Sequence, residues 1–228
     1  MKKSIQFLAV LMILWMGLAA LAQAALVDRG GGLIYDTDLN VTWLQDANYA
    51  NTTGYIAEGV HFDTQFPTYT GMLWSAAMTW AANLSYYDVV RGVTYSDWRL
   101  PKAYLPSSTN ICFGGNCSES EIGHLWYTEL GNTYMNGAQT SWNTGPFQHL
   151  QSWYWTQTPD PDIEPWAVWF RWSTGEQSSG VKEFYYNSVW AVRDGDVAAQ
   201  SNTVPLPSAL LLLGSGLAGL TGVRRFYK

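Results

Sequence analysis

Three oxygen-bearing side chains alternate along one short polar segment near the start of the chain: Asp36, Asp38 and Asn40. Alternating oxygen ligands open the calcium loop of EF-hand proteins, so calcium is the metal to consider here. The segment lacks two further marks of that loop, because Val41 replaces the required glycine and Ala47 replaces the required acid. We therefore interpret it as a solvated turn, predict no cofactor or metal, and retain calcium as the alternative.

The histidines offer little further chemistry, because His61, His124 and His149 are far apart in the sequence. Glu121 and His124 are spaced to share a helix face, but the sequence supplies no evident third ligand. An acidic, proline-containing loop at residues 160–164 could hold a cation only weakly. Neither a nucleophile elbow nor a phosphate-binding loop is present, so the sequence predicts a protein that is not an enzyme.

Cys112 and Cys117 are the two cysteines of the chain, and a short glycine-containing segment separates them. In an exported protein, two nearby cysteines are typical of a disulfide, and a zinc site would need further ligands at suitable spacing. Closing so small a ring stabilises a fold by roughly 2 kcal/mol. We therefore predict a disulfide that fixes a surface loop rather than the whole domain.

Tryptophan is unusually frequent, with 13 in the chain. Exposed aromatic faces beside a few polar groups are typical of sugar sites, and the candidates here are Trp142, Asn143, Trp153 and Trp155. Because neighbouring strand residues point to opposite faces, either Trp153 and Trp155 face the core and Tyr154 faces out, or the reverse. For any one tryptophan, packing in the core is the more frequent role.

The charge of the central part excludes one class of function. Five of the 12 Lys and Arg residues lie in the two terminal segments, whereas all 18 Asp and Glu residues lie between them, so residues 25–204 carry a formal charge of −11. So acidic a domain repels phosphates and anionic membrane surfaces, and we predict no nucleic-acid partner.

The N-terminus has the layout of a secretory signal peptide, residues 1–24. Lys2 and Lys3 precede an apolar stretch at residues 5–21, and the small-x-small site that follows predicts cleavage between Ala24 and Ala25. A retained membrane anchor is the alternative. An exported chain of about 180 mature residues suits one domain, which we place at residues 25–197.

The C-terminus carries three features in order after a spacer at residues 198–203. A proline motif, an uncharged segment at 208–223 and a basic end follow one another, and the motif and basic end comprise Val204, Pro205, Leu206, Pro207, Arg224 and Arg225. A helix of 16 residues would span roughly 24 Å, slightly short of a bilayer core of about 30 Å. We predict a transmembrane helix with its basic end in the cytoplasm. An ordinary single-span anchor is the alternative.

This tail resembles the PEP-CTERM sorting signal of Gram-negative bacteria, in a Val-Pro-Leu-Pro variant, over residues 204–228. The resemblance implies an inner-membrane intermediate, processing by an exosortase-type membrane protease, and delivery to the cell surface or the extracellular matrix.

Hydrophobic patterning predicts the elements that position these residues. Strands are expected at 33–35 and 41–44, a loop at 48–71, and a helix at 75–84. A capping box with Ser118 as the cap predicts a second helix, which buries Ile122, Leu125, Trp126 and Leu130 and ends at Gly131.

Strands are expected next at 153–156, 166–172 and 189–193, with a turn at Thr174-Gly175. Two helices placed before several antiparallel strands predict an α+β domain. Between the helices, Arg99 stands among apolar neighbours, so a buried guanidinium would need carboxylate or carbonyl partners. We interpret this segment as a structural brace formed by Trp98, Arg99, Leu100 and Pro101.

The order of these segments resembles the Lcl C-terminal-domain family, a bacterial domain of unknown function, over nearly all of residues 33–197. The similarity lies in Trp43-Leu44-Gln45-Asp46, the helix with Trp80, Ser96-Asp97-Trp98-Arg99-Leu100-Pro101, Ser120-Glu121-Ile122-Gly123-His124-Leu125, Tyr154-Trp155-Thr156 and Trp190-Ala191-Val192-Arg193-Asp194-Gly195. The resemblance implies a C-type-lectin-like fold, distantly shared with formylglycine-generating enzymes. It also implies adhesion, because the family's namesake ends a collagen-like surface adhesin.

The sequence therefore predicts an exported surface or matrix protein that binds extracellular polysaccharide or another surface component. A structural matrix unit with no discrete ligand is the first alternative. A formylglycine-generator-like enzyme is the second, and it would need Cys112 or Cys117 as a free thiol.

Overall fold

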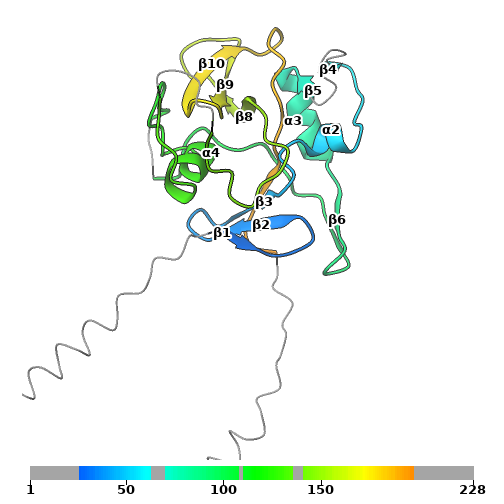
Figure 1. The fold of residues 1–228 in the computed structure, drawn as a ribbon. Helices are drawn as coiled ribbons and strands as arrows, with labels where there is room; N and C mark the ends of the chain where they lie inside the picture. Colours follow the sequence, from blue (N-terminus) through cyan, green and yellow to red (C-terminus); the bar gives the residue numbers. More distant parts are fainter. Residues whose placement is uncertain (1–25, 63–69, 108–109, 136–140, 198–228) are drawn as a thin grey trace, which may run out of the picture. The chain divides into compact units, whose positions relative to one another are not determined.

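Two hydrophobic strands, β2 (Leu33–Asp36) and β3 (Val41–Leu44), form the hairpin at the centre of the first sheet. The computed structural model describes residues 26–62, 70–107, 110–135 and 141–197. In this sheet β1 (Leu26–Asp28) pairs with β2, and β11 (Val192–Asp194) pairs with β3, all antiparallel. Both strands of the predicted hairpin are confirmed, and the sheet joins the beginning of the domain to its end (Figure 1).

The second sheet has the order β10–β9–β8 and is also antiparallel. Strands β8 (Trp153–Pro159) and β9 (Trp166–Arg171) occupy two of the regions predicted as strands. Strand β10 (Glu176–Val181) follows the predicted turn, but its sequence Glu-Gln-Ser-Ser-Gly-Val has no hydrophobic alternation and did not predict a strand. In the view of Figure 1, this sheet lies at the top of the coloured ribbon and the first sheet at its lower edge.

The predicted helix at 75–84 is confirmed as α3 (Trp74–Asn83), and it buries Ala77, Trp80 and Ala81. A short hairpin follows it, formed by β6 (Tyr86–Asp88) and β7 (Val93–Tyr95).

The prediction of a loop over residues 48–71 was wrong in part. This region contains a single helical turn, α2 (Tyr49–Thr52), and a two-stranded antiparallel pair of β4 (Val60–Phe62) and β5 (Thr70–Met72). The elements are only three or four residues long and rich in Gly, Asn and Thr, so neither strand nor helix periodicity could develop. Tertiary contacts hold them, such as the backbone pair between Met72 and Asn187.

The second predicted helix begins at Glu121 rather than after Ser118. It consists of α4 (Glu121–His124) and the π-helical segment η1 (Leu125–Glu129). Ser120 is the cap, because its hydroxyl accepts a hydrogen bond from the Gly123 N–H at 3.0 Å. The four predicted apolar residues are buried, and Gly131 follows with a positive φ of 64°.

Aromatic side chains fill the core between these elements. Trp190 lies at the centre, with ring centroids 4.8–5.6 Å from those of Trp43, Tyr154, Trp172 and Phe147. Its indole N–H donates to the Leu44 carbonyl at 2.7 Å, so the polar atom of this buried side chain is satisfied.

The described residues thus form a mixed fold with few helices and antiparallel sheets, as predicted. Within those residues, no helix is long and apolar enough to cross a membrane. The predicted membrane segment at 208–223, the sorting motif and the signal cleavage site at Ala24 and Ala25 lie outside the described residues.

Candidate functional site

The second sheet and the loop that follows it enclose a cleft of about 390 Å³. This volume lies within the range of small-molecule sites, roughly 300–1,000 Å³. Six residues line it, and we call it the aromatic cleft: Trp153, Trp169, Ser179, Tyr185, Tyr186 and Asn187. Trp153 lies on β8, Trp169 on β9 and Ser179 on β10, whereas the last three residues belong to the loop between β10 and β11.

The four rings of the aromatic cleft are held in place but remain accessible. Trp153 and Trp169 pack edge to face, with centroids 4.7 Å apart, and both are partly buried. Tyr185 and Tyr186 are 49 % and 40 % exposed. The guanidinium of Arg171 lies 4.6 Å from the Trp153 ring, which adds a cation–π contact that fixes this ring.

Gly180 allows the close approach of these rings to the sheet. A side-chain carbon at this position would lie 2.9 Å from the Tyr185 ring and 3.2 Å from the Trp169 indole nitrogen. A larger residue on β10 would therefore displace the tyrosine that borders the aromatic cleft.

Asn187 gives the aromatic cleft a buried polar group that lacks a partner. Its side chain is 7 % exposed, and its Nδ2 makes no hydrogen bond to any described residue. The backbone of Asn187 is fixed by two hydrogen bonds to Met72, of 2.9 and 3.2 Å. An unsatisfied buried donor costs about 1–3 kcal/mol, so a rotation of this side chain that lets a ligand hydroxyl accept from the amide would recover that free energy.

Ser179 is less free to bind a ligand, because its hydroxyl donates to an oxygen of Asp160. The other oxygen of Asp160 accepts from the backbone N–H groups of Asp162 and Ile163. The acidic loop at 160–164 is thus organised by its own hydrogen bonds, and Glu164 pairs with Lys182 at 3.0 Å. These contacts leave no convergent set of carboxylates for a cation among the described residues of this loop.

A second hollow of about 410 Å³ lies beside α3. It is lined mainly by small, polar and acidic residues, among them Gly59, Ser75, Glu58 and Glu183, with Tyr55 as its one ring. The aromatic cleft is therefore the better platform for a ring-shaped ligand.

Of the four residues predicted to bind a sugar, only Trp153 lines the aromatic cleft. Trp153 lines the aromatic cleft, whereas Trp155 and Tyr154 are both fully buried. The prediction that one of these two neighbours faces out was wrong, because β8 is covered on both faces. The prediction of Trp155 as a ligand contact was therefore wrong. Trp155 is a core residue, and its indole N–H donates to the Met72 carbonyl.

Trp142 and Asn143 lie in a different loop and do not line the aromatic cleft. The Asn143 side chain donates to the Leu130 carbonyl at 2.9 Å, and its backbone N–H donates to the Asn132 side chain at 2.8 Å. These bonds satisfy groups at the end of η1, so Asn143 acts in the structure of the loop. Four further residues of the cleft were not predicted from the sequence, although three consecutive aromatics at 184–186 were a visible signal: Trp169, Tyr185, Tyr186 and Asn187.

The three residues predicted as a weak calcium site, Asp36, Asp38 and Asn40, do not converge in the structure. Asn40 accepts a hydrogen bond from the Tyr35 hydroxyl at 2.8 Å, and one oxygen of Asp36 accepts from the N–H groups of Asp38 and Leu39. The three side chains therefore do not form an EF-hand-like set. These local hydrogen bonds confirm the predicted turn, but it is not solvated throughout, because Asp36 is fully buried.

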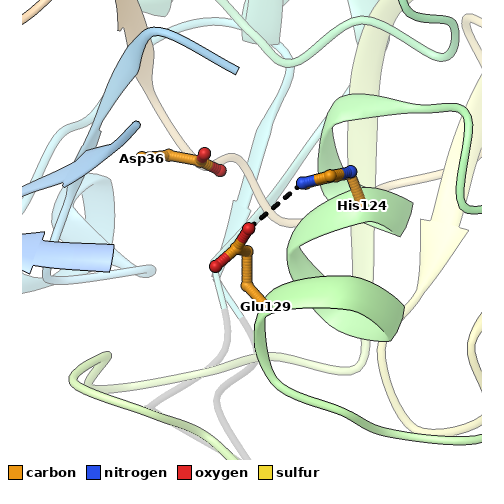
Figure 2. Close-up of side chains that lie close together, drawn as sticks. All are labelled: Asp36, His124 and Glu129. Carbon is orange, nitrogen blue, oxygen red and sulfur yellow. Dashed lines mark hydrogen bonds and ion pairs between the residues drawn. The ribbon is translucent and has the colours of Figure 1, made fainter. Parts of the chain in front are cut away.

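Asp36 instead meets two residues of the second helix, His124 and Glu129 (Figure 2). One ligand atom from each of the three lies within 4.8 Å of the others, and His124 Nε2 is 3.1 Å from Glu129 Oε1. We call these three residues the carboxylate–imidazole cluster. Its members are shielded from water, with Asp36 fully buried and the side chains of Glu129 and His124 exposed by 3 % and 15 %.

Burial governs the charge of this cluster. It raises the pKa of Asp36 to about 6, and the nearby Glu129 carboxylate adds to the rise. His124 and the N–H groups of Leu39 and Asp38 oppose the rise without cancelling it. The predicted neighbour Glu121 is not part of the cluster, although it shares the helix with His124.

Glu121 binds Arg99 instead. Its two oxygens accept from the guanidinium at 2.7 and 2.8 Å, and one also accepts from the Lys102 N–H at 2.7 Å. Asp194 binds the same guanidinium from β11. Burial alone would lower the pKa of Arg99, but the two carboxylates outweigh it and raise that pKa.

The brace predicted for Trp98–Pro101 matches these contacts. Trp98 and Leu100 are 3 % and 1 % exposed, Pro101 is buried, and the Arg99 backbone pairs with Val192. The segment therefore ties the second helix to β11.

Cys112 and Cys117 form the predicted disulfide, with Cα atoms 5.4 Å apart. Gln177 on β10 binds this loop, because its amide donates to the Cys112 carbonyl at 2.7 Å.

No protein-family model, no curated protein and no solved structure matches this chain. The geometry and chemistry of its own residues therefore carry the functional argument.

Proposed function

We propose that this chain is an exported surface or matrix protein whose folded domain binds a carbohydrate in the aromatic cleft. The observation that supports this most directly is the combination of four ordered rings with one unpartnered buried amide. Sugars present apolar C–H faces that stack on aromatic rings and hydroxyls that pair with amides, so both halves of the site have a matching group.

The lining of the aromatic cleft favours a neutral sugar. None of its six residues carries a charge, and the surrounding domain is strongly acidic. Anionic polymers rich in uronic acids would be repelled by that field. We therefore expect neutral polysaccharides to bind more tightly than acidic ones, and we expect no dependence on calcium at this cleft.

The two termini support the localisation part of the proposal. Signal peptide, sorting motif, apolar segment and basic end together suit an exosortase substrate that is delivered to the cell surface or matrix. Membership in the Lcl C-terminal-domain family and a C-type-lectin-like fold belong to the same proposal. They rest on the order of the sequence motifs.

The aromatic cleft and the disulfide bear on the two alternative functions, a structural unit without a ligand and a formylglycine-generator-like enzyme. A packing unit with no ligand would not require exposed rings around an unsatisfied donor. The formylglycine-generator alternative needed a free thiol, but the two cysteines of the chain are joined to each other. Carbohydrate binding is the function that these observations favour.

Tryptophan fluorescence titration of the full-length chain in detergent tests the proposal, with neutral, amino and acidic polysaccharides, each with and without calcium. Tyr185→Ala should weaken binding about tenfold, because the loss of one aromatic contact costs on the order of 1.5 kcal/mol. Tyr87→Ala is the matched control, since Tyr87 is 60 % exposed on the β6–β7 hairpin and outside the cleft. Equal losses in both variants, or no binding to any polymer, would refute carbohydrate binding here.

A further inference from the structure

The carboxylate–imidazole cluster joins two segments that are far apart in the sequence. Asp36 ends β2, whereas His124 ends α4 and Glu129 ends η1. Figure 2 shows the Asp36 carboxylate directed at the gap between the other two side chains. Asp38 lies at its edge, with Oδ2 at 3.9 Å from His124 Nε2.

One oxygen of the cluster has no partner in the described structure. Asp36 Oδ1 accepts two backbone hydrogen bonds, but Asp36 Oδ2 is buried and accepts none from any described residue. A buried, unpartnered carboxylate oxygen is costly unless a cation or a donor occupies the space before it. The missing partner of Asp36 Oδ2 points to a bound cation independently of how close the three side chains lie.

The helix that supplies the other two ligands departs from α-helical geometry between His124 and Glu129. Residues five apart do not share a face of an α-helix, because five steps of 100° leave them about 140° apart. The π-helical segment η1 widens the turn between His124 and Glu129, with the Leu130 N–H donating to the Leu125 carbonyl at 3.0 Å. Single π-turns are frequent at functional sites, and this one places an imidazole and a carboxylate 3.1 Å apart.

The ligand types identify the class of metal. Calcium takes six to eight oxygen ligands, so a site built around an imidazole is a poor match for it. Zinc binds imidazole nitrogen and carboxylate oxygen at about 2.0–2.2 Å in a tetrahedron, which separates ligand atoms by about 3.3 Å. The His124–Glu129 pair already has this separation, and Asp36 has to close by at most about 1.5 Å.

We propose that Asp36, His124 and Glu129 form a zinc site that ties the β2–β3 hairpin to the α4–η1 helix. Asp38 or a water molecule completes the tetrahedron. The site uses none of the residues of the aromatic cleft, so its test is independent of carbohydrate binding. The competing account is a metal-free cluster in which His124 is held by its direct contact with the Glu129 carboxylate.

Metal binding to the full-length chain in detergent decides between these accounts. The chelator-treated protein is dialysed against Zn²⁺, Mn²⁺ or Ca²⁺, and bound metal is measured by mass spectrometry and titration calorimetry. We expect one zinc per chain, weaker manganese binding, and a higher midpoint of thermal unfolding with zinc. Co²⁺ should give the visible absorption of a tetrahedral site.

Asp36→Asn and His124→Gln should each weaken zinc binding at least tenfold. His149→Gln is the matched control, because the 55 % exposed His149 has its Nδ1 3.0 Å from Asp46, and no third metal-ligating side chain joins this pair among the described residues. Asp36→Asn removes a buried charge, so it should fold at least as well as the parent, which circular dichroism would verify. Failure to retain zinc, preference for calcium, or an equal loss in His149→Gln would overturn the proposal.

Discussion

Replacing Glu121 by glutamine should destabilise the domain by about 3 kcal/mol. The Glu121 side chain is 5 % exposed, and it holds the Arg99 guanidinium through two short hydrogen bonds. Breaking a buried ion pair from one side costs about 3–5 kcal/mol, because the remaining charge stays buried without its partner. Glutamine keeps one oxygen for the Lys102 N–H, and Asp194 still contacts Arg99, so the cost should fall near the lower limit.

Thermal unfolding of the full-length chain, followed by tryptophan fluorescence, measures this effect. For a domain of this size, 1 kcal/mol shifts the midpoint by about 2–4 °C, so we expect Glu121→Gln to lower it by roughly 6–12 °C. The matched control is Glu164→Gln, which removes a carboxylate paired with Lys182 but 75 % exposed. That variant should change stability by less than about 1 kcal/mol. Equal midpoints for the two variants would refute the argument from burial.

The remaining predictions concern a glycine, the disulfide and acid stability. Gly175→Ala should lower the free energy of unfolding by about 2 kcal/mol or more, because its φ is +79° and a side-chain carbon would lie 2.5 Å from the Trp126 ring. Gly54→Ala is the control, at φ +67° in open space, and it should lower that free energy by less in the same denaturant titration. Cys112→Ser with Cys117→Ser should lower stability by roughly 2 kcal/mol, measured against the oxidised parent. Hydrogen bonds from Arg99 and Arg193 lower the pKa values of Asp194 and Asp97, so their contribution is complete above about pH 4 and is lost as the pH falls through the folded-state values. A pH series of unfolding midpoints should therefore decline less steeply in acid for Asp97→Asn than for the parent.

Hydrophobic periodicity predicted the elements that carry long apolar patterns. The β2–β3 hairpin, α3, the apolar face of the second helix, and most of β8 and β9 follow from it. Strand β10 could not be predicted, because its polar residues are held by pairing with β9 rather than by their own pattern. Its position then determines the loop that supplies three of the residues lining the aromatic cleft.

The candidate site was only partly accessible from the sequence for a similar reason. Alternation assigns neighbouring strand residues to opposite faces, but it cannot show that both faces of β8 are covered at Tyr154 and Trp155. Trp153, the residue before Tyr154, is only partly buried and lines the aromatic cleft. Likewise, a regular helix separates His124 from Glu129, and only the π-turn brings them together.

The most direct test of carbohydrate binding is an NMR titration that follows the tryptophan indole N–H signals of the full-length chain. We predict that a neutral polysaccharide that binds will shift the signals of Trp153 and Trp169, which line the aromatic cleft, and leave those of Trp142 and the buried Trp155 nearly unchanged. Shifts centred on Trp142, or the absence of shifts at saturating ligand, would contradict the account.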